Sequence, residues 1–144
     1  MTEPQADLDT LARAIVDTAF RLHRDLGPGL LESAYEALLA ARLERDGLVV
    51  DRQVPVDACF DGIVLPAAYK IGLLIERSIV IENKSVKRAS PVHAKQVLTY
   101  IKLGGFPLGF VINFGTPLFK DGIKRLINNS ASLASWRLGA NQKD

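Results

Sequence analysis

The chain has 144 residues, of which 48% are hydrophobic and 24% charged, and its formal net charge is +2. This composition excludes a disordered chain, and the length fits one domain that buries about two-thirds of its unfolded surface. So small a net charge does not by itself indicate a polyanion partner. The single cysteine, Cys59, excludes an internal disulfide and is expected to be buried. The first 25 residues carry charges among their apolar positions. We therefore expect no secretory or membrane-spanning segment, no membrane partner and a cytoplasmic location.

Two amphipathic helices are predicted first. Apolar residues at helical spacing predict a helix over residues 7–25, which the run Gly27-Pro28-Gly29 ends. A second helix follows and stops at Gly47. Its predicted apolar stripe consists of Leu31, Tyr35, Leu38, Leu39 and Leu43.

From residue 48 the apolar period changes to two, which indicates strands. Ser90 as N-cap and Pro91 as the first helical residue predict a third helix, which Gly104 and Gly105 close. Residues 119–127 read as a hairpin or a short final strand. The other predicted strands cover residues 48–54, 56–60, 63–75, 79–84 and 108–113, with a turn at Asp61-Gly62.

This order of elements predicts an α/β fold with a mixed central sheet flanked by helices. We assign residues 1–129 to one domain. Residues 130–144 have weak periodicity and are predicted to be a C-terminal tail that frays.

The strand over 79–84 ends in Glu82 and Lys84, which share one face because side chains alternate along a strand. An apolar strand seldom buries an unpaired charge. The pair therefore either marks the exit of the strand to solvent or performs chemistry. A three-residue turn at 76–78 would place Gly72 opposite Glu82. A carboxylate at position 72 would complete a divalent-metal site, and glycine cannot supply one.

Three further patterns each have an ordinary structural explanation. Glu32 lies in the first turn of the second helix, where the helix dipole favours an acid. His93, Gln96 and Tyr100 fall on one stripe of the third helix, and most such stripes are amphipathic edges. A basic cluster reads either as a solvated rim or as a surface for a phosphate backbone; it consists of Lys84, Lys87, Arg88, Lys95 and Lys102.

Together these patterns resemble one family. Residues 29–35 read G-x-x-E-x-x-Y, the signature of a family of small bacterial proteins in the PD-(D/E)XK nuclease superfamily. The resemblance covers roughly residues 10–127, and it implies a restriction-endonuclease-like fold and metal-dependent hydrolysis of DNA or RNA. It is carried further by residues 52–55, by 81–84 as the E-x-K half of the nuclease motif, and by 91–100, 112–115 and 120–125.

The resemblance also implies roles for single residues. Glu82 and the main-chain carbonyl of Asn83 would bind Mg²⁺ or Mn²⁺, hard cations that prefer oxygen ligands. Lys84 would orient the attacking water and offset charge on the phosphate. Glu32 would be an additional acid beside the metal or its water. Gln96 and Tyr100 match a Q-x-x-x-Y element. This element occurs in the branch of the superfamily that includes recombination helicase-nucleases, where it supports the site and contacts substrate.

Gly72 departs from the family pattern, which has a metal-bridging aspartate there. Three accounts compete: a degenerate, inactive domain, a site completed by a carboxylate from elsewhere, or a deliberate replacement of the aspartate. Glu76 shares the strand face but lies about 13 Å away by strand rise, too far to substitute. The register of the strands that carry Asp57 and Asp61 is open.

Three functional hypotheses follow. The first is a metal-dependent nuclease with an incomplete motif that makes its activity doubtful. The second is a non-catalytic module that keeps the nuclease fold and binds nucleic acid or a protein. The third is homodimerisation through the first helix or the tail around Trp136.

Overall fold

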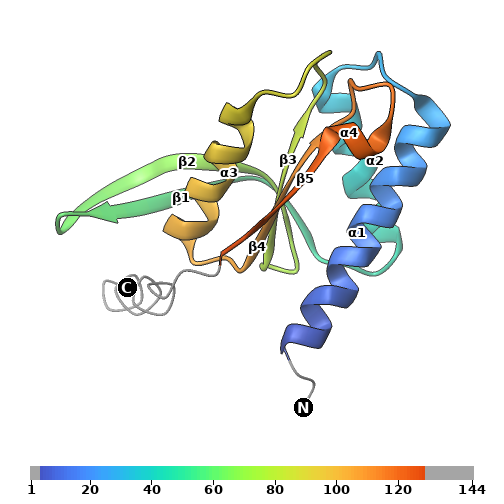
Figure 1. Ribbon diagram of the computed structural model, residues 1–144. Coiled ribbons are helices and arrows are strands. Elements are labelled where there is room, and N and C mark those ends of the chain that lie inside the picture. The colour runs from blue at the N-terminus through green and yellow to red at the C-terminus, as the bar shows by residue number, and fades with distance from the viewer. Residues whose placement is uncertain (1–3, 129–144) are drawn as a thin grey trace.

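The computed structural model describes residues 4–128. In chain order its elements are α1 (Pro4–Leu26), α2 (Glu32–Arg45), β1 (Val50–Phe60), β2 (Ile63–Ile75), β3 (Ile79–Lys84), α3 (Pro91–Gly104), β4 (Leu108–Asn113), α4 (Phe119–Gly122) and β5 (Ile123–Ile127). A central sheet separates α1 and α2 from α3 (Figure 1).

The five strands follow one another in the sheet in the order β1-β2-β3-β4-β5. All neighbours are antiparallel except β3 and β4, which run parallel in a register from Ile79 opposite Leu108 to Lys84 opposite Asn113. The α3 helix connects this parallel pair. The mixed sheet with helices on its faces confirms the predicted fold class. It also brings the carboxyl ends of β3 and β4 to the same edge of the sheet.

The core has two layers because β3 is buried on both faces. Ile79 and Ile81 pack with α1 and α2, whereas Val80 packs with α3. Tyr35 of α2 is fully buried, stacks on Phe114 at 4.5 Å between ring centroids, and donates its hydroxyl to a carbonyl in the loop before α2. Tyr35, the last residue of the G-x-x-E-x-x-Y motif, therefore holds the glycine-containing loop against the core.

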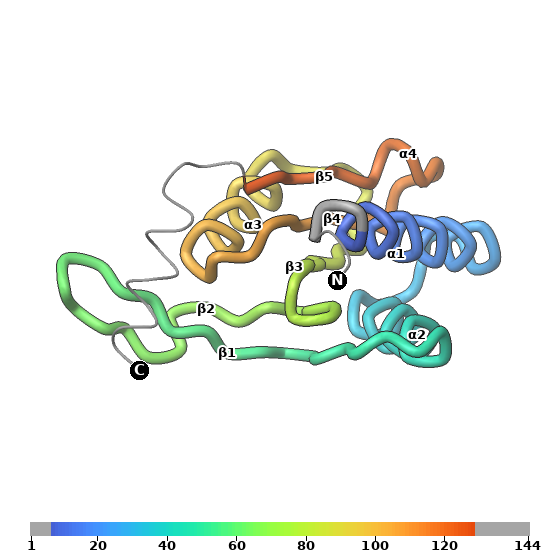
Figure 2. The backbone as a smooth tube through the Cα atoms, turned by 90° about the horizontal axis from the view of Figure 1, so that it is seen from below, coloured from blue at the N-terminus to red at the C-terminus, as the bar shows by residue number. Residues whose placement is uncertain are grey.

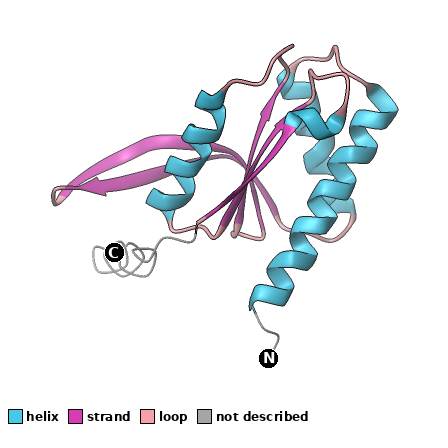
Figure 3. Ribbon diagram, in the orientation of Figure 1, coloured by secondary structure: helices cyan, strands magenta, loops and turns pink. Residues whose placement is uncertain are grey.

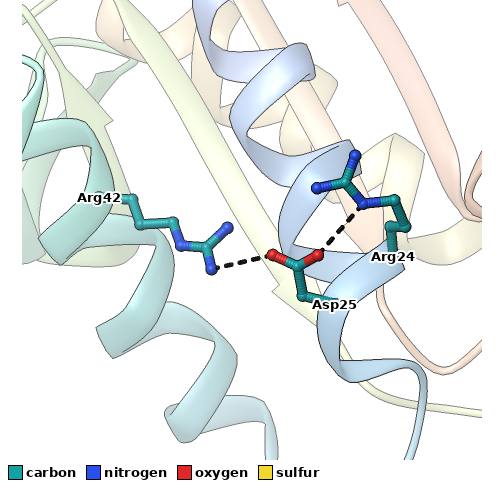
Figure 4. Close-up of polar contacts among 3 residues, drawn as sticks. All are labelled: Arg24, Asp25 and Arg42. Carbon is teal, nitrogen blue, oxygen red and sulfur yellow. Dashed lines mark hydrogen bonds and ion pairs between the residues drawn. The ribbon is translucent and has the colours of Figure 1, made fainter.

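Asp25, at the end of α1, joins this helix to α2 (Figure 4). Its carboxylate accepts a hydrogen bond from Arg24 Nε at 3.1 Å and one from Arg42 Nη2 at 3.3 Å. The hydrogen bond from Arg24 is the main cause that holds the pKa of Asp25 below its ordinary value. The group is fully exposed, so these bonds orient the two helix ends and add little to stability.

One strand prediction was wrong. Residues 50–60 form one strand, although Pro55 was expected to separate two. Pro55 is tolerated because β1 is an edge strand, where a missing N–H leaves no ladder bond unmade. Of the two alternatives for residues 119–127, the short final strand is confirmed as β5, and residues 119–122 form a short helix before it. The bounds of β2, β3 and β4 agree with the prediction.

The predicted stripe of α2 was also partly wrong. Leu31 is 77% exposed and Leu38 is 38% exposed. The buried side is formed instead by Tyr35, Leu39, Ala40 and Leu43. The prediction for α3 was correct: Ser90 accepts a hydrogen bond from Val92 N, and Gly105 adopts the left-handed conformation that ends the helix.

The distal halves of β1 and β2 form a two-stranded arm that extends beyond the helices (Figures 2 and 3). Its register shifts near Asp57, whose carboxylate accepts a hydrogen bond from Ala67 N at 2.8 Å. Cys59 lies on this arm and is half-buried, not buried as predicted, because no helix covers it.

Within residues 4–128 no helix has the length and apolar character needed to cross a membrane. Trp136 and the predicted tail lie outside the described residues.

Candidate active site

Gly72 and Glu82 face each other on β2 and β3, as the turn length predicted. The antiparallel register pairs Leu73 with Ile81, so the next pair toward the site is Gly72 and Glu82. The N–H of Gly72 points at Glu82 Oε1 across 3.4 Å. Position 72 therefore borders directly on the carboxylate of the E-x-K motif.

Glu82 and Lys84 are close and mostly buried. Lys84 Nζ lies 3.8 Å from Glu82 Oε2, and the exposed fractions of the two side chains are 19% and 15%. Burial raises the pKa of Glu82. The charge of Lys84 and the N–H of Gly72 lower that pKa, whereas the charge of Glu32 raises it. Glu32 thus lies within electrostatic reach of Glu82.

Glu36 is the site residue that the sequence analysis missed. A Cβ atom at position 72 would lie 3.3 Å from Glu36 Oε1 and 3.4 Å from Glu82 Oε1. Glu36 Oε2 accepts hydrogen bonds from Arg52 Nε at 3.2 Å and Nη2 at 3.0 Å, and Oε1 accepts one from Gln53 Nε2 at 2.8 Å. Glu36 lies one helical turn beyond Glu32, and this spacing of four residues was the available signal. A carboxylate from α2 therefore enters the space beside Gly72.

The other acids considered from sequence do not reach this space. Glu76 lies in the turn after β2 and accepts a hydrogen bond from Val49 N. Asp57 is bound to Ala67 on the arm, and Asp61 lies in the turn at the arm's tip. The oxygens nearest to a Cβ at position 72 include those of two acids, Glu36 and Glu82.

The predicted stripe of α3 lies beside the same acids. Burial is the main cause that raises the pKa of Tyr100; the charge of Glu82 also raises it, and the side chain of Gln96 lowers it. Desolvation, and then the charge of Lys84, lower the pKa of His93, whereas Glu32 raises it. His93, which the sequence suggested was an ordinary helix-start residue, therefore lies within electrostatic reach of the site.

Tyr69 of β2 holds α3 at this position. Its ring stacks on that of Tyr100 with centroids 4.4 Å apart, and its hydroxyl donates to the Tyr100 carbonyl at 3.1 Å. Asn83 is 5% exposed, and its side-chain nitrogen and oxygen have no hydrogen-bond partner among residues 4–128. Strand alternation turns the Asn83 side chain away from the face of Glu82 and Lys84. The metal role implied for its main-chain carbonyl stays a prediction.

The donor set does not fit a firmly held Mg²⁺ or Mn²⁺. No three histidine, cysteine, aspartate or glutamate side chains of residues 4–128 are grouped so that they could hold a metal ion. The two carboxylates beside Gly72 already face two fixed cations, because Arg52 binds Glu36 and Lys84 lies beside Glu82. Within this group of four the charges cancel, so the net attraction for a dication would come mainly from Glu32, which also acts on Glu82.

The remaining basic residues of the predicted cluster are exposed. Lys87 and Arg88 lie in the loop between β3 and α3, and Lys95 and Lys102 lie on α3 itself. All four side chains belong to exposed residues, and none has an ion-pair partner within 4 Å in the described part of the chain. Their charges are therefore available to a ligand.

Comparison with known proteins agrees with these features. The sequence model of the PD-(D/E)XK nuclease superfamily matches residues 9–126, most of the chain. No curated protein and no solved structure matches. The mixed sheet with its flanking helices corresponds to the restriction-endonuclease-like fold. The chain belongs to the PD-(D/E)XK nuclease superfamily.

Proposed function

We propose that this chain is a nucleic-acid-binding member of the superfamily that does not hydrolyse phosphodiester bonds, because Gly72 leaves its metal site without one carboxylate. The observation that carries the proposal is the environment of position 72. A side chain there would enter directly between the carboxylates of Glu36 and Glu82, at 3.3 and 3.4 Å from its Cβ. This is the place where a third carboxylate would complete a cation site.

Charge balance supports the loss of hydrolysis. Arg52 and Lys84 offset Glu36 and Glu82, so metal binding would have to compete with two internal cations. Mg²⁺ loses its hydration water reluctantly and prefers oxygen ligands in strict octahedral geometry. A carboxylate on residue 72 would give the group a net negative charge and a further oxygen ligand.

The charge distribution supports binding to nucleic acid. Between Glu82 and Asp121 the chain has no acidic residue. The basic side chains of this stretch lie in the loop that directly follows β3 and on α3. A cationic surface of this kind attracts the phosphate backbone by releasing condensed counterions.

The test is the substitution Gly72→Asp. The backbone of Gly72 lies outside the left-handed region. A Cβ there would meet Glu36 Oε1 at 3.3 Å, and Glu82 Oε1 and the Ile81 carbonyl at 3.4 Å, so aspartate can be accommodated with a small shift of the Glu36 side chain. We expect Gly72→Asp to bind Mn²⁺ roughly tenfold more tightly or better, since a lost ligand or supporting group costs about 10- to 100-fold in metal affinity. Calorimetric titration measures this affinity, alongside cleavage of single- and double-stranded DNA and RNA.

Gly72→Asn is the matched control, because it has the same size and no charge. Without metal, Gly72→Asp is expected to melt below Gly72→Asn, since a third carboxylate repels Glu36 and Glu82, and Mn²⁺ should reverse this order. Equal metal affinities for the two variants would refute the alignment of Gly72 with the missing ligand.

One specific observation favours a second candidate, an active nuclease. Glu36 already places Oε1 beside position 72 and would be the replacement ligand. Robust metal-dependent cleavage by the unaltered chain that Glu36→Gln abolishes would establish this candidate and overturn our proposal.

A further inference from the structure

A depression of about 640 Å³ lies at the carboxyl ends of β3 and β4, directly after Lys84. Three segments form its walls: the loop before α2, the loop after β3 and the turn after β4. In open α/β sheets, ligands bind outside the carboxyl ends of parallel strands, and the volume lies within the range of ligand pockets. The lining residues are Pro28, Gly29, Leu30, Ser85, Val86, Lys87, Arg88, Gly115 and Pro117.

The walls of this pocket are bound to one another. Buried Asn113 at the end of β4 accepts hydrogen bonds from Val86 N and Gly115 N and donates one to Val86 O, each at 3.0 Å. Ser85 Oγ donates to the carbonyl of Leu30 at 2.7 Å. Gly115 is required at its position, because a Cβ there would clash with the backbone of Val86. The pocket is therefore preformed.

The lining combines apolar surface with positive charge. Leu30 and Val86 are 41% and 40% exposed, and two proline rings extend this apolar surface. Lys87 and Arg88 lie beside it, and none of the described lining residues is acidic. An apolar wall next to two cations suits a ligand with a flat apolar body and an anionic group attached to it. A nucleotide has this chemistry, since extruded bases pack between apolar side chains and cations bind phosphate.

A second depression lined by basic residues lacks this chemistry. It lies between α1 and α2, where Arg24 and Arg42 bind Asp25 (Figure 4). Its charges are largely compensated within the protein, and it has little apolar surface.

We propose that the pocket after Lys84 holds one unpaired nucleotide of a single strand, with the base on Leu30 and Val86 and the phosphate on Lys87 and Arg88. The inference rests on the proposed nucleic-acid binding and specifies the form of the ligand. Bases inside a duplex stay stacked and cannot reach an apolar wall without being extruded. The site should therefore prefer single strands.

The experiment measures fluorescence anisotropy with three labelled probes of equal length, in chelator and at low salt. They are a mixed-sequence single strand, the matching duplex, and a single strand in which every nucleotide is abasic. We expect the ordinary single strand to bind roughly five- to tenfold more tightly than the abasic strand, at the lower end of the range known for base stacking on aromatic side chains, because leucine and valine offer a base a smaller contact.

Leu30→Ser is the diagnostic variant, and Leu38→Ser is its control, because Leu38 is similarly exposed on α2 but lies outside the pocket. The backbone bonds of Leu30 do not involve its side chain. We expect Leu30→Ser to weaken the ordinary single strand about fivefold and to leave the abasic strand unchanged, with no effect of Leu38→Ser. If Leu30→Ser unfolds, Val86→Thr, which keeps the branched shape, gives the same comparison.

The outcomes separate this inference from the function on which it rests. Equal binding of the ordinary and abasic strands, unaffected by Leu30→Ser, would overturn the nucleotide pocket and leave nucleic-acid binding intact. No binding of any probe at low salt would overturn both and would indicate a protein partner for this surface.

Discussion

Glu36 is central to the site, although the residue type and its place on the helix do not by themselves distinguish it from other acids. From sequence it is one more acid on an amphipathic helix. Its importance depends on the docking of α2 against β1, where Arg52 and Gln53 bind it, and on the absence of a side chain at Gly72. Gln53 adopts a left-handed backbone conformation, φ 52°, which no sequence rule assigns to glutamine here. The E-x-K pair, in contrast, follows from strand alternation alone.

A residue-scale prediction concerns Glu82. Its folded-state pKa lies above the ordinary value, mainly through burial, so its contribution to stability is fully present below about pH 4.5 and is lost as the pH rises through the folded-state pKa. In the Glu82→Gln variant the side chain is neutral at every pH, so this loss of stability with rising pH does not occur. We expect the variant to melt above the unaltered chain at pH 7 to 8, with the difference vanishing near pH 4.

Thermal unfolding across this pH range measures the effect, and Glu44→Gln is the control because Glu44 is an exposed acid on α2. A variant less stable than the unaltered chain at pH 7 would mean that the ion pair with Lys84 outweighs the cost of burying the carboxylate.

At the scale of elements, strand positions were predictable wherever the sequence alternates or is continuously apolar. β2, β3 and β4 follow this rule, and the cap residues Ser90 and Gly105 delimit α3. The failures have one origin. Whether Pro55 interrupts a strand depends on which strand lies at the sheet edge, and whether Leu31 is buried depends on where α2 docks. Both outcomes depend on tertiary packing, which the local sequence pattern does not determine.

The element-scale prediction concerns the clamp between β4 and the loop after β3. Asn113→Ala would leave Val86 N, Val86 O and Gly115 N without their partner. We expect a loss of about 3 kcal/mol in the free energy of unfolding, since each buried unsatisfied group costs roughly 1–3 kcal/mol. Nucleic-acid affinity should also fall, because Lys87 and Arg88 follow Val86 in the released loop.

Asn128→Ala is the control for this variant. Asn128 is also buried and donates to the carbonyls of Ile101 and Phe106, far from the loop after β3. Chemical unfolding should show that Asn128→Ala destabilises the fold. Anisotropy under conditions in which the variant is still folded should show that its nucleic-acid affinity is unchanged. Equal losses of affinity in both variants would show that the clamp has no specific connection with binding.

At the scale of the whole molecule, a net charge of +2 conceals a strong separation of charge. The arm over residues 56–69 carries two aspartates and no basic residue, whereas the stretch from Lys84 to Lys102 carries five basic residues and no acid. The amino-acid composition gives only the net charge and not the positions of the charged residues. The fold places these basic residues at the end of β3, in the loop that follows it and on the exposed side of α3.

The whole-molecule prediction is a salt dependence. Replacing both Lys87 and Arg88 with alanine should reduce the magnitude of the log-log slope of nucleic-acid affinity against salt by about two units, because each phosphate contact releases about one counterion. The control is the pair Lys124→Ala and Arg125→Ala on β5, which removes the same charge elsewhere. A slope that both pairs change equally would mean that overall charge, not this surface, determines binding.

The order of the strands has a consequence for how the chain reaches this structure. Each strand lies beside the strand that precedes it. The β1-β2 and β2-β3 pairs close across short turns that cost little loop-closure entropy, whereas β3 and β4 are joined through α3. Such local topologies fold faster than those built from distant pairings. Gly72 and Glu82 are ten residues apart and meet within one hairpin. The stretch of chain that must close to bring Glu36 to Gly72 is much longer. By loop length alone, bringing Glu36 to Gly72 costs about 1 kcal/mol more loop-closure entropy than bringing Gly72 to Glu82, so the hairpin with the E-x-K motif is the part of the site that assembles at lower entropic cost.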